Sequence, residues 1–125
     1  MKKPNILLVD DEVDFVEMIS MRLRASGYEV AALYEGESVL NTISHQRPDL
    51  VILDLMLPKV DGYTVCAAMK KNADFRNIPV IILTAKDPSS EAQMTGESAA
   101  DACLIKPFDP KELLDKIKEL IKKSS

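Results

Sequence analysis

Several features are scarce in this sequence, and each shortage excludes a class of protein. The two cysteines, Cys66 and Cys103, form no CxxC pair, and His45 is the one histidine, so a tetrahedral zinc site lacks ligands. Reduced thiols are the expected state of both cysteines. No apolar run is long enough to span a membrane, and the run at 6–9 is too short for the core of a signal peptide. We therefore expect a cytoplasmic protein without a membrane partner.

Positive charge is also in short supply. Lysine and arginine number 16 against 20 aspartates and glutamates, which gives a net charge of -4 and a pI near 5.0. An acidic surface offers no attraction to the phosphates of nucleic acid, so direct nucleic-acid binding is not expected. The length of 125 residues suits one domain, and the 46% of hydrophobic residues suits a globular core. We expect a single domain over residues 1–125.

Short apolar runs alternate with amphipathic segments along the chain. The runs are NILLV (5–9), EVAAL (29–33), LVILD (50–54), PVIILT (79–84) and ACLI (102–105). Such continuous apolar runs are typical of strands buried on both faces of a parallel sheet. The segments between them have helical spacing, with Gly27 placed to end the first helix and Pro110 placed to begin the last. The pattern predicts an α/β fold, a doubly wound three-layer sandwich around a five-stranded parallel sheet.

The segment before the fifth strand is a poor helix. Residues 88–99 contain serines, a threonine and Gly96, and Met94 is their one large apolar residue. Both helix propensity and an apolar stripe are therefore weak. We predict that this helix is short or mobile.

Polar residues with complementary chemistry stand at the ends of four predicted strands. Asp10 and Asp11 follow the first, Asp54 ends the third, Thr84 ends the fourth and Lys106 follows the fifth. Ligands of doubly wound sheets bind at this edge. If the first and third strands are neighbours, the three carboxylates share one pocket and need a divalent cation, for which Mg²⁺ is suited. The lysine and threonine would help to hold a phosphoryl group.

Four blocks of the sequence resemble the receiver domain of two-component response regulators, the CheY-like family. They are LLVDDE, LDLMLPKVDGY around Asp54, LTAKD around Thr84 and IKPF around Lys106, and the resemblance covers essentially the whole chain. It implies strand order 2-1-3-4-5, which makes the first and third strands neighbours. It also implies a phosphorylation-activated signalling switch.

The resemblance implies a role for each residue of the site. Asp54 would be the phosphoacceptor, taking a phosphoryl group from a phosphohistidine on a sensor histidine kinase or phosphotransfer protein, or from acetyl phosphate. Thr84 and Lys106 would contact the phosphoryl oxygens. The bond between Lys106 and Pro107 would be cis, which costs little before proline.

The metal ligands also follow from the resemblance. Asp11, Asp54 and the backbone carbonyl of Met56 would bind Mg²⁺ directly, and Asp10 would contribute largely through water. The chain's own catalysis would be limited to its Mg²⁺-dependent phosphorylation and dephosphorylation, so we do not expect an enzyme acting on a separate substrate.

The signal would leave through the face formed by residues 88–99, the strand 102–105 and the last helix, which would contact an effector domain, a partner protein or a second copy. The family usually has Tyr or Phe three residues before the lysine, as a switch that moves with the threonine. Here Cys103 stands in that place, and Ala99 replaces the glycine of the GAD motif. With Thr84 and Cys103 as the switch pair, we predict that signalling depends more on order in 88–99 than on an aromatic ring.

Other functions fit the sequence less well. A phosphohydrolase of the haloacid dehalogenase type needs Asp-x-Asp after a buried strand, but Met56 follows Asp54 and Glu12 follows Asp10 at that spacing. An interaction module that takes no phosphate would not need every group of the site. Glu12 and Asp14 are interpreted as acids favoured at a helix N-terminus, where they cap amides and face the dipole.

Overall fold

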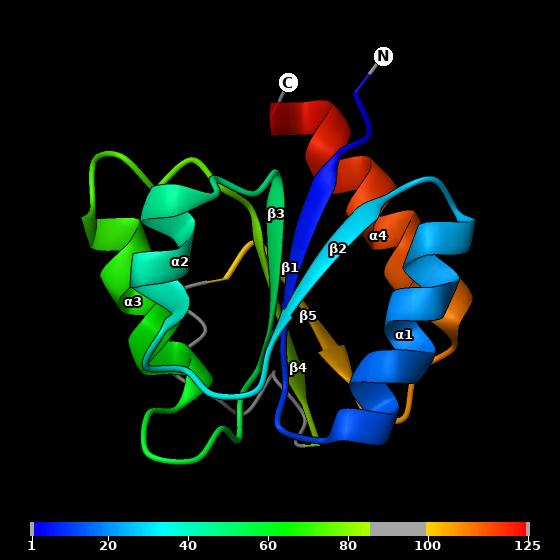
Figure 1. Ribbon diagram of the computed structural model, residues 1–125, viewed down its shortest axis with the longest axis horizontal. Helices are drawn as coiled ribbons and strands as arrows, with labels where there is room; N and C mark the ends of the chain where they lie inside the picture. The colour runs from blue at the N-terminus through cyan, green and yellow to red at the C-terminus, as the bar shows by residue number, and fades with distance from the viewer. Residues whose placement is uncertain (1, 86–99, 125) are drawn as a thin grey trace.

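Five short apolar segments form one parallel sheet in the computed structural model, which describes residues 2–85 and 100–124 (Figure 1). The sheet order is β2-β1-β3-β4-β5, as predicted. The strands are β1 (Asn5–Val9), β2 (Glu29–Leu33), β3 (Leu50–Asp54), β4 (Val80–Thr84) and β5 (Ala102–Ile105). Val9 of β1 pairs with Leu53 of β3, so the ends of these two strands lie next to each other.

Four helices are described, and they cover the sheet on both faces. They are α1 (Val13–Ala25), α2 (Val39–His45), α3 (Gly62–Lys71) and α4 (Pro110–Ser124). Figure 1 shows α1 and α4 on one face and α2 and α3 on the other, which confirms the three layers. None of these helices is both long and apolar enough to cross a bilayer. The helix predicted within 88–99 lies outside the described residues.

The side chains of the central strands alternate between two cores. Leu7 and Val9 of β1 join the core under α2 and α3, whereas Ile6 and Leu8 join the core under α1 and α4. Every residue of β3 and β4 is buried. The prediction that all five strands are buried on both faces is wrong for β2 and β5, because they are the two edges of the sheet and many of their residues are only half-buried.

The helix boundaries have local causes in the sequence. Gly27 has φ of +99° just after α1, a conformation that glycine adopts without strain, and this confirms its predicted role as a helix terminator. At the start of α3, the carboxylate of Asp61 accepts a hydrogen bond from the backbone N–H of Thr64 at 2.8 Å. Before α4, the backbone N–H of Lys111 donates to Asp109 at 2.9 Å. These caps fix where the loops beside the sheet begin and end.

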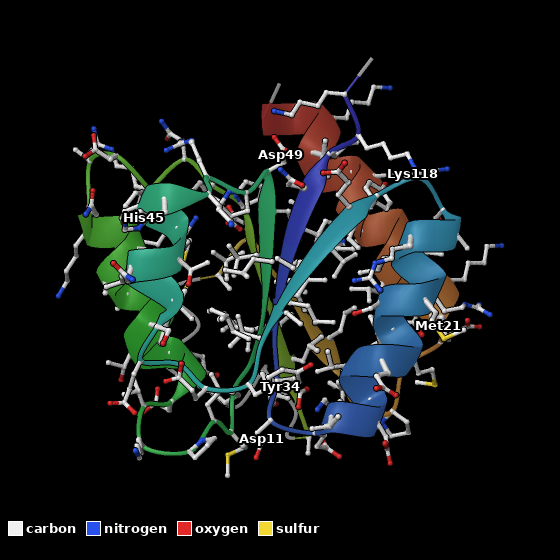
Figure 2. The ribbon with its side chains drawn as sticks, in the orientation of Figure 1. Asp11, Met21, Tyr34, His45, Asp49 and Lys118 are labelled. Atoms are coloured by element: carbon white, nitrogen blue, oxygen red, sulfur yellow. The ribbon has the colours of Figure 1, made fainter. Side chains whose placement is uncertain are left out.

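The carboxyl ends of the strands, with the loops that follow them, meet at one edge of the sheet. The backbone N–H of Asp10 donates to Leu33 at the end of β2 (3.1 Å). On the other side of the sheet, the N–H of Lys106 donates to Thr84 at the end of β4 (2.7 Å). Figure 2 shows Asp11 at this edge, with Asp49 and Lys118 at the opposite end near both termini.

Both cysteines are free thiols within the cores or against them. Cys66 of α3 is fully buried, and burial raises its pKa to about 11, so the thiol is protonated at neutral pH. Cys103 of β5 packs against the core under α2 and α3, and burial raises its pKa as well. The environment of both thiols fits small apolar core residues.

Candidate functional site

Three carboxylates from two neighbouring strands converge at the edge of the sheet. Asp10 and Asp11 follow β1 and Asp54 ends β3, and one carboxylate oxygen from each lies within 4.8 Å of the others. Asp10 is fully buried, Asp54 is 5% exposed and Asp11 is exposed. The register of β1 with β3 brings these side chains together, because Val9 and Leu53, the residues before them, are paired.

Within residues 2–85 and 100–124, Lys106 is the cation of this site. Its Nζ lies 2.8 Å from Asp10 Oδ2, 3.1 Å from Glu12 Oε1 and 3.6 Å from Asp54 Oδ1. The side chain reaches this place from the loop after β5, where the bond between Lys106 and Pro107 is cis, as predicted. One ammonium therefore faces three carboxylates, and the site keeps an excess of negative charge.

The surroundings change the proton affinity of the site residues. Burial raises the pKa of Asp54, the charge of Asp10 raises it further, and Lys106 and the backbone N–H of Met56 oppose the shift. For Lys106, burial acts to lower the pKa, but the hydrogen bond and charge of Asp10, together with Glu12 and Asp54, outweigh it, and the pKa is raised. The ammonium is therefore charged at neutral pH, while a charged Asp54 is held at an energetic cost.

The donor set suits a hard divalent cation. It consists of carboxylate oxygens, two from nearly or fully buried side chains and one from the exposed Asp11. Mg²⁺ prefers oxygen ligands, takes one or two carboxylates from protein and keeps several waters. Met56 lies two residues after Asp54, the last residue of β3, and a carbonyl ligand from it stays a prediction.

Thr84 and Cys103 lie where the sequence placed them. Thr84 ends β4 and is buried, and its neighbour on β5 is Ile105. Cys103 lies two residues earlier on β5, opposite Ile82, with its side chain against the core under α2 and α3. Their roles as a switch pair stay a prediction.

Two residues of the site were not predicted. Glu12 is the N-cap residue of α1, but its side chain makes no capping hydrogen bond and instead reaches Lys106, so the capping role proposed for it is wrong. The ring of Phe15 lies under the same ammonium, with its centroid 4.4 Å from Nζ. Their positions in the sequence could have indicated this, because both residues follow the acidic pair at the edge of the sheet where Lys106 also lies.

Gly62 sits against the backbone of the phosphoacceptor candidate. A Cβ at this position would lie 2.6 Å from the carbonyl oxygen of Asp54 and 3.0 Å from Cα of Leu55. The N–H of Gly62 also donates to the carbonyl of Leu55 at 2.9 Å, so the first residue of α3 is held to the end of β3. Only a residue without a side chain fits this approach.

Gly62→Ala is therefore expected to lower the free energy of unfolding by about 1–3 kcal/mol, because the backbone of β3 must move to admit the methyl group. Urea unfolding followed by circular dichroism measures the change. Glycine to alanine inside a helix normally stabilises by about 0.5–1 kcal/mol. An unchanged or more stable variant would contradict the close approach.

Comparison with known proteins gives one consistent family. The model of the response regulator receiver domain matches residues 6–118. A curated relative, "Probable transcriptional regulator ycf27" of Porphyridium aerugineum, is 40% identical over 124 residues, which are 98% of this chain and 50% of the relative. The chain spans about half the length of the curated relatives it matches.

Solved structures agree with this family. The signal receiver domain of a signal transduction histidine kinase from Syntrophus aciditrophicus is 33% identical, with a TM-score of 0.89 over 96% of this chain and 91% of that chain. The receiver domain of the sensor histidine kinase PA1611 from Pseudomonas aeruginosa, which has magnesium coordinated in its active-site cleft, is 28% identical, with a TM-score of 0.85 over 97% of this chain and 99% of that chain. The chain belongs to the response regulator receiver domain family, the phosphorylation-activated signalling switches of two-component systems.

Proposed function

We propose that Asp54 is the phosphoacceptor of this switch. The observation that carries the proposal is the position of its carboxylate at the end of β3, nearly buried, 3.6 Å from Lys106 Nζ and beside two further carboxylates. A carboxylate in this position can act as the nucleophile at phosphorus, and the lysine can stabilise the negative charge of the phosphoryl oxygens.

The transfer is a displacement at phosphorus. A carboxylate oxygen of Asp54 forms a bond to phosphorus while the bond to the donor breaks, and the electron pair leaves with the imidazole of a phosphohistidine or with acetate. The ammonium of Lys106 donates a hydrogen bond to a phosphoryl oxygen, and the hydroxyl of Thr84 donates another. Catalysis by this chain consists of its own phosphorylation and of the later hydrolysis of the acyl phosphate.

The acid cluster would hold Mg²⁺ through Asp11, Asp54 and the backbone carbonyl of Met56, with Asp10 contributing largely through water. The ion would supply the positive charge that lets a phosphoryl group approach the carboxylates of Asp10, Asp11 and Asp54. Lys106 contacts two of these three carboxylates, those of Asp10 and Asp54. The oxygen-only donor set supports this assignment, and so does the magnesium named in the cleft of the Pseudomonas aeruginosa receiver domain.

The partners follow from the family. We propose that residues 1–125 form one receiver domain of the cytoplasm that takes its phosphoryl group from a sensor histidine kinase or phosphotransfer protein. It would pass the signal to an effector domain or partner protein, or to a second copy, through residues 88–99, β5 and α4. The name of the ycf27 relative, a transcriptional regulator about twice as long as this chain, supports an effector outside these residues. The net charge of -4 supports the absence of direct nucleic-acid or membrane binding here.

Incubation with acetyl phosphate tests the proposal directly. Intact mass spectrometry is expected to find one added phosphoryl group on the wild type when Mg²⁺ is present and none when it is chelated. Peptide mapping is expected to place the group on Asp54. Absence of any phosphoryl adduct in Mg²⁺, or an adduct on another residue, would overturn the assignment.

A phosphohydrolase of the haloacid dehalogenase type is not supported. Met56 occupies the place of the second aspartate in that mechanism, and its exposed side chain has no group that transfers a proton.

A further inference from the structure

The ammonium of Lys106 is enclosed from two sides by different kinds of group. Carboxylates of Asp10, Glu12 and Asp54 lie at 2.8, 3.1 and 3.6 Å. The aromatic ring of Phe15 is a further neighbour, with its centroid 4.4 Å from Nζ. Cations within about 6 Å of a ring centroid are attracted by the negative charge of the ring face. The ring therefore contributes attraction as well as shielding, since the lysine side chain is only 19% exposed.

The ring of Phe15 is itself held in place. It belongs to the first turn of α1 and packs against the core under α1 and α4. The ring of Phe108 stands nearly perpendicular to it, at 87° and 6.1 Å between centroids, from the loop that also carries Lys106. Perpendicular contact is a favoured arrangement for two aromatic rings. The orientation of Phe15 is thus set by the core on one side and by Phe108 on another.

We propose that Phe15 is a positioning residue for Lys106, holding the ammonium over the acid cluster where it meets the phosphoryl group. This inference rests on the proposed function of Lys106. A lysine stem has four rotatable bonds and about 2 kcal/mol of rotamer entropy, so it reaches one orientation only when its neighbours restrict it. Phosphoryl transfer depends largely on positioning and charge, so a displaced ammonium lowers the rate.

Glu12 makes this positioning more necessary. Its carboxylate is mostly exposed and lies 3.1 Å from the same ammonium, so it competes with Asp54 for that cation. The ring of Phe15 packs against the core and against Phe108, whereas the side chain of Glu12 is mostly exposed to water. When a phosphoryl group arrives on Asp54, the ammonium exchanges a carboxylate partner for a phosphoryl oxygen while its contact with the ring persists.

The simpler explanation is that Phe15 is only a core residue whose ring fills space. The two explanations differ in one respect: a positioning role acts through Lys106, and a packing role does not. Substitution of Phe15 should therefore change the reaction rate when Lys106 is present and leave it unchanged when Lys106 is absent.

The test measures the initial rate of phosphorylation by acetyl phosphate at saturating Mg²⁺. Phe15→Leu, which keeps an apolar side chain without a ring, is expected to lower the rate by about threefold to tenfold, as loss of a partly buried cation–π contact implies. Phe15→Tyr keeps the ring face and is expected to restore most of the rate. Phe75→Leu removes a ring from the opposite core, where Phe75 packs, and is the matched control, expected to react like the wild type.

The same substitution is then made beside Lys106→Met. If Phe15 acts through the lysine, Phe15→Leu has no further effect on the slow rate of Lys106→Met. If Phe15→Leu lowers the phosphorylation rate by the same factor in the wild type and in Lys106→Met, the proposal is overturned and Phe15 has only a packing role. Should Phe15→Leu fail to fold, Phe15→Met takes its place in the cycle.

Nuclear magnetic resonance provides a readout that needs no phosphorylation. The ε-methylene protons of Lys106 are expected to be shifted by the ring current of Phe15, and this shift should vanish in Phe15→Leu and persist in Phe15→Tyr. If the wild type is not phosphorylated at all, the proposed function fails, and the methylene shift alone decides whether the ring holds the lysine. Unchanged Lys106 signals in Phe15→Leu would overturn the inference whatever the kinetics.

Discussion

Asp54→Asn is expected to abolish phosphorylation by acetyl phosphate and, without Mg²⁺ at neutral pH, to raise the free energy of unfolding by about 1–3 kcal/mol. The first effect follows because an amide oxygen is a poor nucleophile for phosphorus. The second follows because the substitution removes a nearly buried charge from beside Asp10 and Asp11. If the variant is more stable but does not react, the charge of Asp54 serves the reaction and not the stability of the fold.

The stability gain should depend on pH in a definite direction. Burial and Asp10 raise the pKa of Asp54 above its value in the unfolded chain, so between the two values the folded protein binds more protons than the unfolded protein. The stability of the wild type therefore falls as pH rises from the unfolded to the folded pKa of Asp54. Above the folded pKa, the full cost of the buried charge is present. The gain in free energy of unfolding from Asp54→Asn should be small near pH 3, which is below the pKa of about 4 for an aspartate in the unfolded chain. At neutral pH the gain should be complete.

Urea unfolding in the presence of a chelator, repeated across that pH range, measures this difference. Asp115→Asn is the matched control, because Asp115 is an exposed residue of α4 remote from the site. It should change stability little at any pH. A loss of stability in Asp54→Asn at neutral pH would mean that the charge of Asp54 is well compensated by its surroundings.

Lys106→Met is expected to lower the free energy of unfolding by about 2–4 kcal/mol in the absence of Mg²⁺. Asp10 is fully buried and its carboxylate lies 2.8 Å from the ammonium, so removing the cation leaves a buried charge without its strongest partner. Methionine keeps most of the apolar stem, which confines the change to the charge. Phosphorylation should also be slow in this variant, because the ammonium that is proposed to meet the phosphoryl oxygens is gone.

Lys116→Met provides the comparison for Lys106→Met. Lys116 pairs with Glu119 one turn along α4 at 3.2 Å, and both side chains are exposed enough for water to screen the pair. Its loss should cost less than about 0.5 kcal/mol. Saturating Mg²⁺ should narrow the difference between the two lysine variants, since a bound cation compensates Asp10. Equal stabilities of the two variants in chelator would contradict the buried ion pair.

Local patterns were enough to predict the five strands and the three layers. Each apolar run became a strand, with a difference of one residue at Pro79. Full burial in β3 and β4 and partial burial in β2 and β5 both leave a run of apolar residues. The strand order came from resemblance to the receiver family. Once β1 and β3 were neighbours, the convergence of Asp10, Asp11 and Asp54 followed from the direction of parallel strands.

The remaining features depend on contacts that no local pattern encodes. The half-buried residues of β2 resemble those of a central strand in sequence, because apolar side chains at a sheet edge are still partly covered by α1. Glu12 has the position of a capping residue, but a lysine from the far end of the chain competes for its carboxylate. Phe15 fits the apolar stripe of α1, and its contact with Lys106 exists only after β1 and β5 are in place.

The central claim is that the carboxylates at the ends of β1 and β3 form one site for a divalent cation. Thermal unfolding in rising MgCl₂ tests it most directly, because a ligand that binds only the folded state raises the melting temperature with its concentration. We expect the wild type to be stabilised progressively and Asp11→Asn to respond far less, because this variant loses the exposed carboxylate of the proposed site and keeps the buried Asp10 and Asp54. An identical response of the two proteins to Mg²⁺ would contradict the claim.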